Sequence, residues 1–230
     1  MASGLLQHTD SLAQEAPYEE RYWGRATPGT SAAEGMTEGD FAAEFKTEPF
    51  DAIRTLRAFV EFGLVTKVDA TKWLFPLILK ARGDLREHIY ETLLHWEEPD
   101  AILIAALGEY YKHGNEERLA LAASLLADIG APALQTLRIL VRSGSPECEM
   151  FVSVIARLRG VSVQSRLAIL AQVPANPSAD VRYSLLEALR VFTPHEGIPL
   201  LQTLSHDEDP DIADEARARL ESLEAELQQG

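Results

Sequence analysis

The chain has 230 residues, 46% of them hydrophobic, and a formal net charge of −15. This is enough apolar material for a sizeable core. The shortage of lysine and arginine argues against nucleic-acid binding, because contacts to the phosphate backbone depend on basic side chains. No run of about 18 apolar residues occurs, so we expect no membrane association. Cys148 is the only cysteine, which excludes an internal disulfide and favours a reducing compartment. We therefore expect a cytoplasmic protein.

The acidic residues are concentrated at the two ends of the chain. Residues 1–49 contain 9 acidic and 3 basic residues, and residues 207–230 contain 9 and 2. The stretch between them is close to neutral. Acidic ends attract a partner with basic patches through long-range electrostatics.

Residues 1–37 have the composition of an N-terminal tail. Pro17 interrupts a short apolar segment, and Thr27–Ser31 has the composition of a linker. Tyr18, Tyr22 and Trp23 stand among charged residues, where solvated aromatic rings favour contact with a surface. Two interpretations stay open: the segment folds back onto the first helices, or it binds a partner and becomes ordered there.

Regular helices are predicted from about residue 40 onward. Asp40 is a suitable N-cap for a short helix that carries the i,i+4 pair Phe41 and Phe45. The apolar stripe Ile53, Leu56, Phe59 and Val60 then predicts a helix that begins at about Phe50, and a second helix is expected over about 69–81.

A short phrase, an acid two positions before an arginine, is repeated at a fixed distance. The successive arginines are 32 and then 64 positions apart. The same register holds for leucine or isoleucine three positions and seven positions after each arginine. The three phrases are Asp84–Arg86, Glu116–Arg118 and Asp180–Arg182. This self-similarity predicts an all-α solenoid of stacked helical hairpins.

About five hairpins and a C-terminal capping helix are expected within residues 38–230. The fourth hairpin is irregular, because Ser153 and Arg157 replace column residues that are apolar elsewhere. Its core must then come from four other apolar residues. They are Phe151, Val154, Ile155 and Leu158. The last helix, from Asp211, has the polar outer face that a terminal repeat needs.

The stretch from Ser178 to Leu220 resembles the HEAT-like repeat of the kind found in phycobilin lyases. The resemblance is carried by Asp180-Val181-Arg182, by Gly197-Ile198-Pro199-Leu200-Leu201 and by Asp209-Pro210-Asp211-Ile212. It implies a right-handed α–α superhelix whose second helices line a concave surface. It also implies that an acid and an arginine near the start of each first helix link successive repeats. These structural ladder residues would be Asp84, Arg86, Glu116, Arg118, Asp180 and Arg182.

Repeats of this type occur in scaffolds, adaptors, inhibitors, bilin lyases and a metal-dependent deoxyhypusine hydroxylase. The hydroxylase uses several His-Glu pairs, whereas this chain has only His195-Glu196. His88, Glu91 and His95 share one helix face, yet they lack the convergent groups that close a metal site. We therefore expect no metal and no cofactor.

The second helices carry the most plausible binding residues. Gln135, Arg138 and Arg142 form one polar stripe, at spacings i, i+3 and i+7. Positions aligned with them in other repeats are Tyr110, Gln202 and His206. If the second helices line the concave side, Tyr110, Arg138, Arg142, Gln202 and His206 share one groove. A solvated polar face is the alternative.

No serine-histidine-aspartate arrangement or phosphate-binding glycine loop is present in the sequence, and Cys148 has no basic neighbour that would activate it. We expect no catalytic residues. The sequence therefore favours a non-enzymatic protein-interaction module, such as an adaptor, scaffold or inhibitor, that binds a protein through its concave face. The aromatic tail is a second candidate contact. The alternative is a bilin lyase-like enzyme or attachment factor acting on an open-chain tetrapyrrole.

Overall fold

A computed structural model describes residues 35–229, and residues from Met36 onward form one compact unit. The protein is all-helical over this range, with twelve α-helices, four short 3-10 segments and no strand. The α-helices are α2 (Glu38–Thr47), α3 (Pro49–Glu61), α4 (Lys67–Ile78), α5 (Asp84–Trp96), α6 (Pro99–His113), α7 (Glu117–Ile129), α8 (Leu134–Arg142), α9 (Glu149–Arg157), α10 (Val163–Leu170), α11 (Ala179–Ala188), α12 (Pro194–Leu204) and α13 (Pro210–Gln229). The 3-10 segments are η1 (Ala131–Ala133), η2 (Pro146–Cys148), η3 (Val173–Ala175) and η4 (Leu189–Val191).

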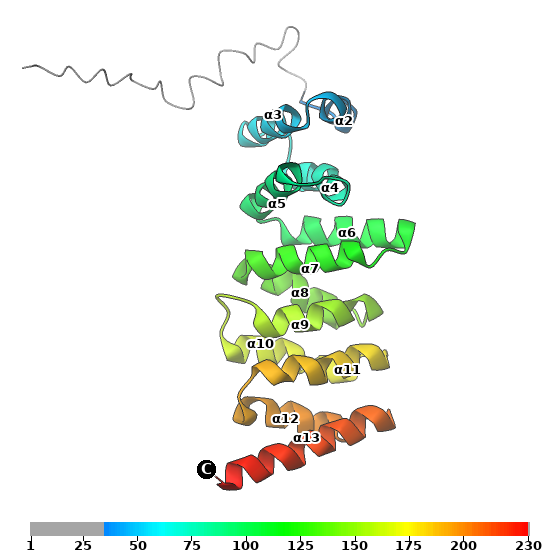
Figure 1. Ribbon diagram of the computed structural model, residues 1–230, viewed down its shortest axis with the longest axis vertical. Helices are drawn as coiled ribbons and strands as arrows, with labels where there is room; N and C mark the ends of the chain where they lie inside the picture. The colour runs from blue at the N-terminus through cyan, green and yellow to red at the C-terminus, as the bar shows by residue number, and fades with distance from the viewer. Residues whose placement is uncertain (1–34, 230) are drawn as a thin grey trace, which may run out of the picture. The chain divides into compact units, whose positions relative to one another are not determined.

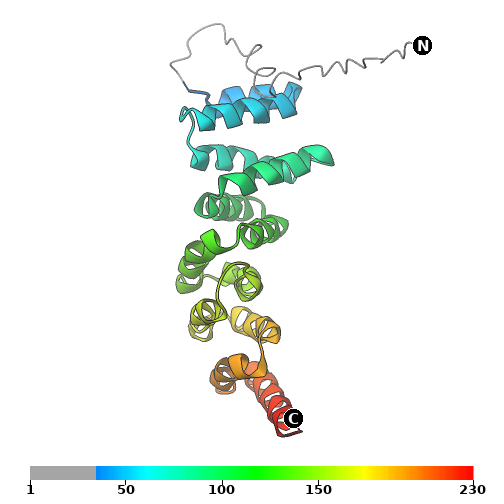
Figure 2. The same ribbon diagram turned by 90° about the vertical axis from the view of Figure 1, so that its left-hand side faces the viewer.

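The helices of this unit follow one another in chain order from α2 to α13 (Figure 1). Five hairpins and a capping helix would give eleven helices. The twelfth is α2, which is the short helix expected around Phe41. Figure 2 shows several of the central helices end-on, so their axes lie close to one direction. The predicted tail, with Tyr18, Tyr22 and Trp23, lies almost wholly outside the described residues.

The repeated apolar columns are buried, as the 32-residue register predicts. Both columns behind the arginines lie in one continuous core, and so does a third column in the second helices. These buried residues are Ile89, Leu121 and Leu185; Leu93, Leu125 and Leu189; and Leu137, Ile169 and Leu201. Each fully buried leucine or isoleucine contributes about 1.5–3 kcal/mol relative to an exposed one. The columns therefore hold successive helices together.

The irregular fourth repeat is also packed as expected. The four residues predicted to replace the missing column positions are buried: Phe151, Val154, Ile155 and Leu158. Ser153 and Arg157, which break the column, are exposed. The apolar face of α9 is therefore rotated slightly relative to the other first helices.

The most extensive helix packing is not within the expected hairpins. The most extensive contacts join α9 to α11, α6 to α7, and α4 to α6. Helices α6 and α7 are both rich in alanine, and the distance between packed helices depends on the size of the side chains between them. Small side chains thus account for the extensive packing of α6 against α7.

The start of α2 differs from the sequence prediction. Thr37, and not Asp40, is the N-cap, and Asp40 closes a capping box by accepting the backbone N–H of Thr37 at 3.1 Å. Because the threonine hydroxyl accepts the Asp40 amide in return, the two residues satisfy two otherwise unpaired N–H groups. The predicted ring pair is present, with the centroids of Phe41 and Phe45 at 5.6 Å.

The C-terminal helix α13 has one buried face and one solvated face. Ile212, Ala213 and Ala216 are buried, whereas Asp214 and Arg217 are exposed. This is the pattern expected of a terminal helix. None of the helices in residues 35–229 has both the length and the apolarity needed to cross a bilayer.

Gly130, between α7 and η1, occupies a backbone conformation that other residues rarely adopt. Its φ is +76°, and a Cβ atom there would lie 3.0 Å from the carbonyl oxygen of Arg159. We expect Gly130→Ala to destabilise the protein by about 1–3 kcal/mol, because the added carbon is strained and collides with rigid backbone.

Urea unfolding followed by far-UV circular dichroism measures this effect. Gly39→Ala is the matched control, because Gly39 lies inside α2 at an ordinary φ, with its nearest Cβ contact at 3.7 Å. Equal stability of the Gly130→Ala protein and the wild type would contradict the assignment of strain.

Candidate functional site

Helices α6 and α8 lie side by side and run in the same direction. Near their N-terminal ends, the hydroxyl of Thr136 donates to Asp100 Oδ1 at 2.5 Å. Near their C-terminal ends, the hydroxyl of Tyr111 donates to Glu147 Oε1 at 2.8 Å, and Glu147 lies just beyond α8. One bond at each end fixes the register of the two helices.

Helix α10 extends this arrangement. Nε of Arg142 donates to Oε1 of Gln172 at 2.9 Å, just past the end of α10. The amide nitrogen of Gln172 donates in turn to the carbonyl of Ala168 at 3.1 Å. Arg142 is therefore held in place by a neutral amide, and its positive charge remains uncompensated by that contact.

An exposed apolar surface lies over α6 and α8. Ile104 is 59% exposed, Ile139 is 57% exposed and Tyr111 is 67% exposed. Ile104 lies about one helical turn after Asp100, and Ile139 lies about one turn after Thr136. Because Asp100 and Thr136 are hydrogen-bonded, the two isoleucine side chains lie near each other. We call this the α6–α8 surface, and define it as Ile104, Gly108, Tyr111, Arg138, Ile139 and Arg142.

Gly108 lies in the middle of this surface and has no packing role in the chain itself. It is exposed within α6, and a Cβ atom at this position would meet no other atom within 4 Å. Glycine in a helix interior destabilises it by about 0.5–1 kcal/mol relative to alanine. The described fold thus contains a destabilising residue that its own packing does not require.

The predicted groove residues are only partly brought together. Arg138 and Arg142 are exposed on α8, as the stripe predicts. Tyr110 is half-buried against the core, with its ring centroid 5.6 Å from that of Tyr111. The exposed tyrosine is therefore Tyr111, which the sequence alignment of repeats did not indicate.

Gln202 is exposed on α12 and His206 is exposed just beyond the end of that helix, where its Nδ1 lies 2.9 Å from the carbonyl oxygen of Gln202. Within residues 35–229, no hydrogen bond or ion pair joins either of them to α8. Sequence reasoning also missed Ile104, Gly108 and Ile139. The i,i+7 spacing of Ile104 and Tyr111 could have suggested an apolar stripe on α6.

Charge is distributed unequally between the two sets of helices. The first helices of the expected repeats (α3, α5, α7, α9 and α11) carry 10 acidic and 6 basic residues, and the capping helix α13 carries 6 and 2. The second helices (α4, α6, α8, α10 and α12) carry 4 acidic and 6 basic residues. Helices α8 and α10 contain three arginines and no acidic residue. The acidity is thus a property of the first helices as well as of the two ends.

Two shallow hollows lie elsewhere on the described part of the chain. The larger, of about 500 Å³, lies between α5 and α7, and its lining includes Arg86 and Tyr90. The smaller, of about 230 Å³, lies between η4, α12 and α13. Neither hollow is lined by any of the predicted groove residues, and Arg86, in the larger one, was predicted as a ladder residue.

The histidine face of α5 has no metal-binding geometry. Over residues 35–229, no group of three or more His, Cys, Asp or Glu side chains is arranged to hold a metal ion. His88 packs against Phe50, with ring centroids 5.8 Å apart. Burial and the nearby charge of Arg57 lower the pKa of His88, so its neutral form is favoured.

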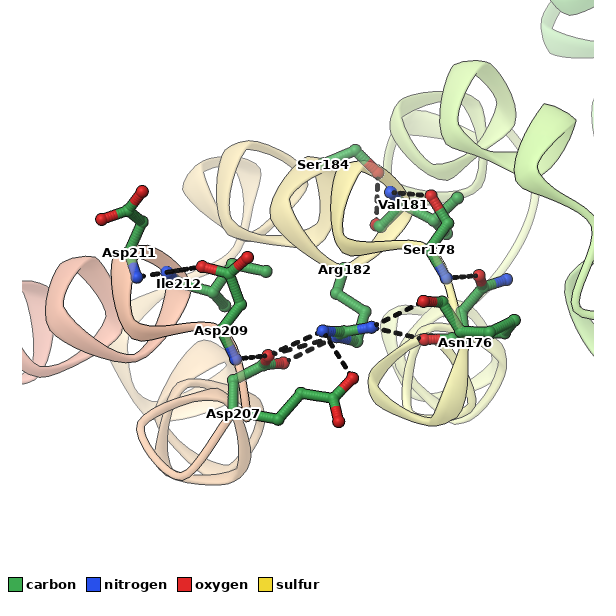
Figure 3. Close-up of polar contacts among 11 residues, drawn as sticks. Asn176, Ser178, Val181, Arg182, Ser184, Asp207, Asp209, Asp211 and Ile212 are labelled. Carbon is green, nitrogen blue, oxygen red and sulfur yellow. Dashed lines mark hydrogen bonds and ion pairs between the residues drawn. The ribbon is translucent and has the colours of Figure 1, made fainter.

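Arg182 forms the most extensive buried polar cluster (Figure 3). Its Nε donates to Asp207 Oδ2 at 2.9 Å and its Nη2 to Asp207 Oδ1 at 3.0 Å, while Nη1 donates to the carbonyl of Asn176 at 2.9 Å. The side chains of Arg182 and Asp207 are each only 4% exposed. The hydrogen bond to Asp207 is the largest cause of a raised pKa of Arg182.

This cluster connects α11 to the start of α13. Asp207 Oδ1 also accepts the amide of Asp209 at 2.9 Å, and Asp209 Oδ1 accepts the amide of Asp211 at 3.0 Å. Side-chain oxygens that accept unpaired N–H groups at a helix start act as caps. Arg182 therefore supports the turn that begins the last helix.

The other predicted ladder residues lie in different settings. Arg118 pairs with Glu109 of the preceding helix, Nε to Oε2 at 3.4 Å, although that nitrogen makes no hydrogen bond in the described residues. Arg86 is exposed. The acids of the three phrases, Asp84, Glu116 and Asp180, are exposed as well. A ladder that links all three phrases stays a prediction. Among the three arginines, Arg182 is the one with close hydrogen bonds to a carboxylate.

Cys148 is fully buried, and Nδ2 of Asn176 lies 3.5 Å from its sulfur. Burial is the largest cause that raises the pKa of this thiol from 9.0 to about 11, with smaller contributions from Glu147 and Glu149. The thiol is therefore protonated near neutral pH, in agreement with a structural role.

Comparisons with family models, with curated proteins and with solved structures find no match for this chain.

We expect Arg182→Met to destabilise the protein by about 3–5 kcal/mol, because it leaves the buried carboxylate of Asp207 without its counter-charge. Arg86→Met is the control, with an expected change within about 0.5 kcal/mol at an exposed position. Urea unfolding measures both. Replacing Asp207 by leucine in the Arg182→Met protein should restore part of the loss. A loss as small as that of the control would refute the structural role.

A second prediction concerns alkaline pH. The folded state keeps the Cys148 thiol protonated up to about pH 11, whereas the unfolded state ionises near its ordinary pKa of 9.0. The contribution of this thiol to stability is therefore complete below pH 9.0 and is lost as pH rises towards about 11.

The free energy of unfolding should fall across this pH window, and the Cys148→Ala protein should show a shallower fall. The native protein should also react slowly with a thiol reagent at about pH 8. Rapid reaction without unfolding would show that the thiol is accessible.

Proposed function

We propose that this chain is a HEAT-like helical solenoid, wound as a right-handed superhelix, that acts without catalysis as a protein-binding module. The buried 32-residue columns support the repeat interpretation. The exposed apolar side chains of the α6–α8 surface, which two inter-helix bonds hold in register, support a binding role more than any other observation. Tyrosine and arginine beside apolar residues are typical of protein interfaces.

The cytoplasm is the proposed compartment, because a single cysteine cannot form an internal disulfide. A partner with basic patches remains the expectation for the acidic first helices. The α6–α8 surface has the opposite charge, so a partner that binds there contacts Arg138 and Arg142.

Reversing two charges tests the surface. We expect Arg138→Glu with Arg142→Glu to reduce capture of the partner at least tenfold, because acidic residues replace the two exposed arginines of α8. The immobilised protein is exposed to extract of its native host, and captured proteins are identified by mass spectrometry. Circular dichroism should show unchanged helicity, because both positions are exposed.

Arg86→Glu with Arg157→Glu is the matched control. These two arginines are exposed on first helices, and their side chains form no hydrogen bond or ion pair with the described residues. Capture that survives the α8 double change but fails in the control would place the interface on the first helices. A visible absorbance acquired with an open-chain tetrapyrrole would instead support the bilin alternative.

A further inference from the structure

From the α6–α8 surface we infer that the partner presents an acidic, amphipathic α-helix that crosses closely over Gly108. This inference rests on the proposed function, because it specifies what the same surface binds. Three properties of the surface support this inference. They are its shape at Gly108, the absence of a β-sheet edge to which a peptide could add, and its charge.

The shape favours close approach of another backbone. Ile104 and Tyr111 rise from α6 on either side of Gly108, at i−4 and i+3, and Ile139 stands on the neighbouring helix. A Cβ atom at Gly108 would meet nothing within 4 Å, so no side chain fills the position between Ile104 and Tyr111, and we call this open position the depression at Gly108. The fold itself does not require glycine at position 108. A partner whose backbone lies close to the Gly108 Cα would explain the glycine, because any larger residue would block that approach.

The secondary structure favours a helix over an extended segment. An extended peptide gains its main-chain hydrogen bonds by adding to the edge of a sheet, and residues 35–229 contain no strand. A helix satisfies its own backbone groups and presents side chains at i, i+3, i+4 and i+7. The depression at Gly108 between apolar side chains is suited to such a helix.

The charge favours acidic side chains on that helix. Helices α6, α8 and α10 together carry two acidic and four basic residues. The side chain of Arg138 has no hydrogen-bond or ion-pair partner among the described residues, and the side chain of Arg142 bonds only to the neutral amide of Gln172. Glu147, at the edge of the surface, accepts hydrogen bonds from Tyr111 and Ser145. The attraction for acidic residues is therefore centred on α8.

Two synthetic peptides of about 20 residues test the inference. One is an amphipathic helix of leucine, alanine and glutamate, and the other has lysine at each glutamate position. We expect the acidic peptide to bind at least tenfold more tightly than the basic one, with an affinity that falls as salt rises. Calorimetric titration of the full chain measures both.

The Arg138→Glu, Arg142→Glu protein should reverse this preference. Gly108→Leu should weaken binding of the acidic peptide at least tenfold, because its side chain fills the depression. Gly108→Ala should raise Tm by roughly 2–4 °C while it weakens binding, since alanine favours the free helix. Ala218→Leu, at an exposed position of α13, is the control and should leave binding unchanged.

The possible outcomes separate this inference from the proposed function. Tighter binding of the basic peptide, or full binding by the Gly108→Leu protein, would overturn the inference. Binding of neither peptide by a protein that still captures a host partner through Arg138 and Arg142 would also overturn it, while the proposed function would stand. Host capture that ignores the α8 charges would show that the partner binds elsewhere on the chain, and the α6–α8 surface would then have no part in the proposed function.

Discussion

The structure depends on one constraint: no helix in residues 35–229 can bury its apolar face by itself. Leu93, Leu125 and Leu189 recur at equivalent positions, and each is buried only because a neighbouring helix covers it. Burial of apolar surface is the main favourable term in folding. The helices are therefore stable as a continuous series, and their outward faces are free to serve other purposes.

This freedom is visible in the contrast between the two sets of helices. The first helices carry the excess of acidic residues, and the second helices carry a small excess of basic residues. On α6 and α8, large apolar side chains and a helix-interior glycine also remain exposed. Glycine in a helix interior and exposed isoleucine lower the stability or solubility of a free protein, and the proposed contact with a partner would account for both.

The three arginines of the repeated phrase illustrate how similar local sequences acquire different roles. Arg182 is buried because Asp207 and the carbonyl of Asn176 are within reach of its guanidinium group. Arg118 meets the carboxylate of Glu109, and Arg86 faces solvent. A buried arginine requires partners for its charge, and in the described repeats those partners come from segments that do not keep the 32-residue register.

The sequence by itself determined where helices form and which of their faces are apolar, because a period of 3.6 residues is a local property of the chain. It predicted the buried columns and the substitute core of the fourth repeat, Phe151 to Leu158. Only the tertiary structure decided which helices pack most extensively, that Tyr111 is exposed and Tyr110 half-buried, and that Thr37 caps α2. It also decided that Gly108 faces open space. These features depend on atoms that are distant in sequence or on the exact start of a helix, and apolar periodicity carries information about neither.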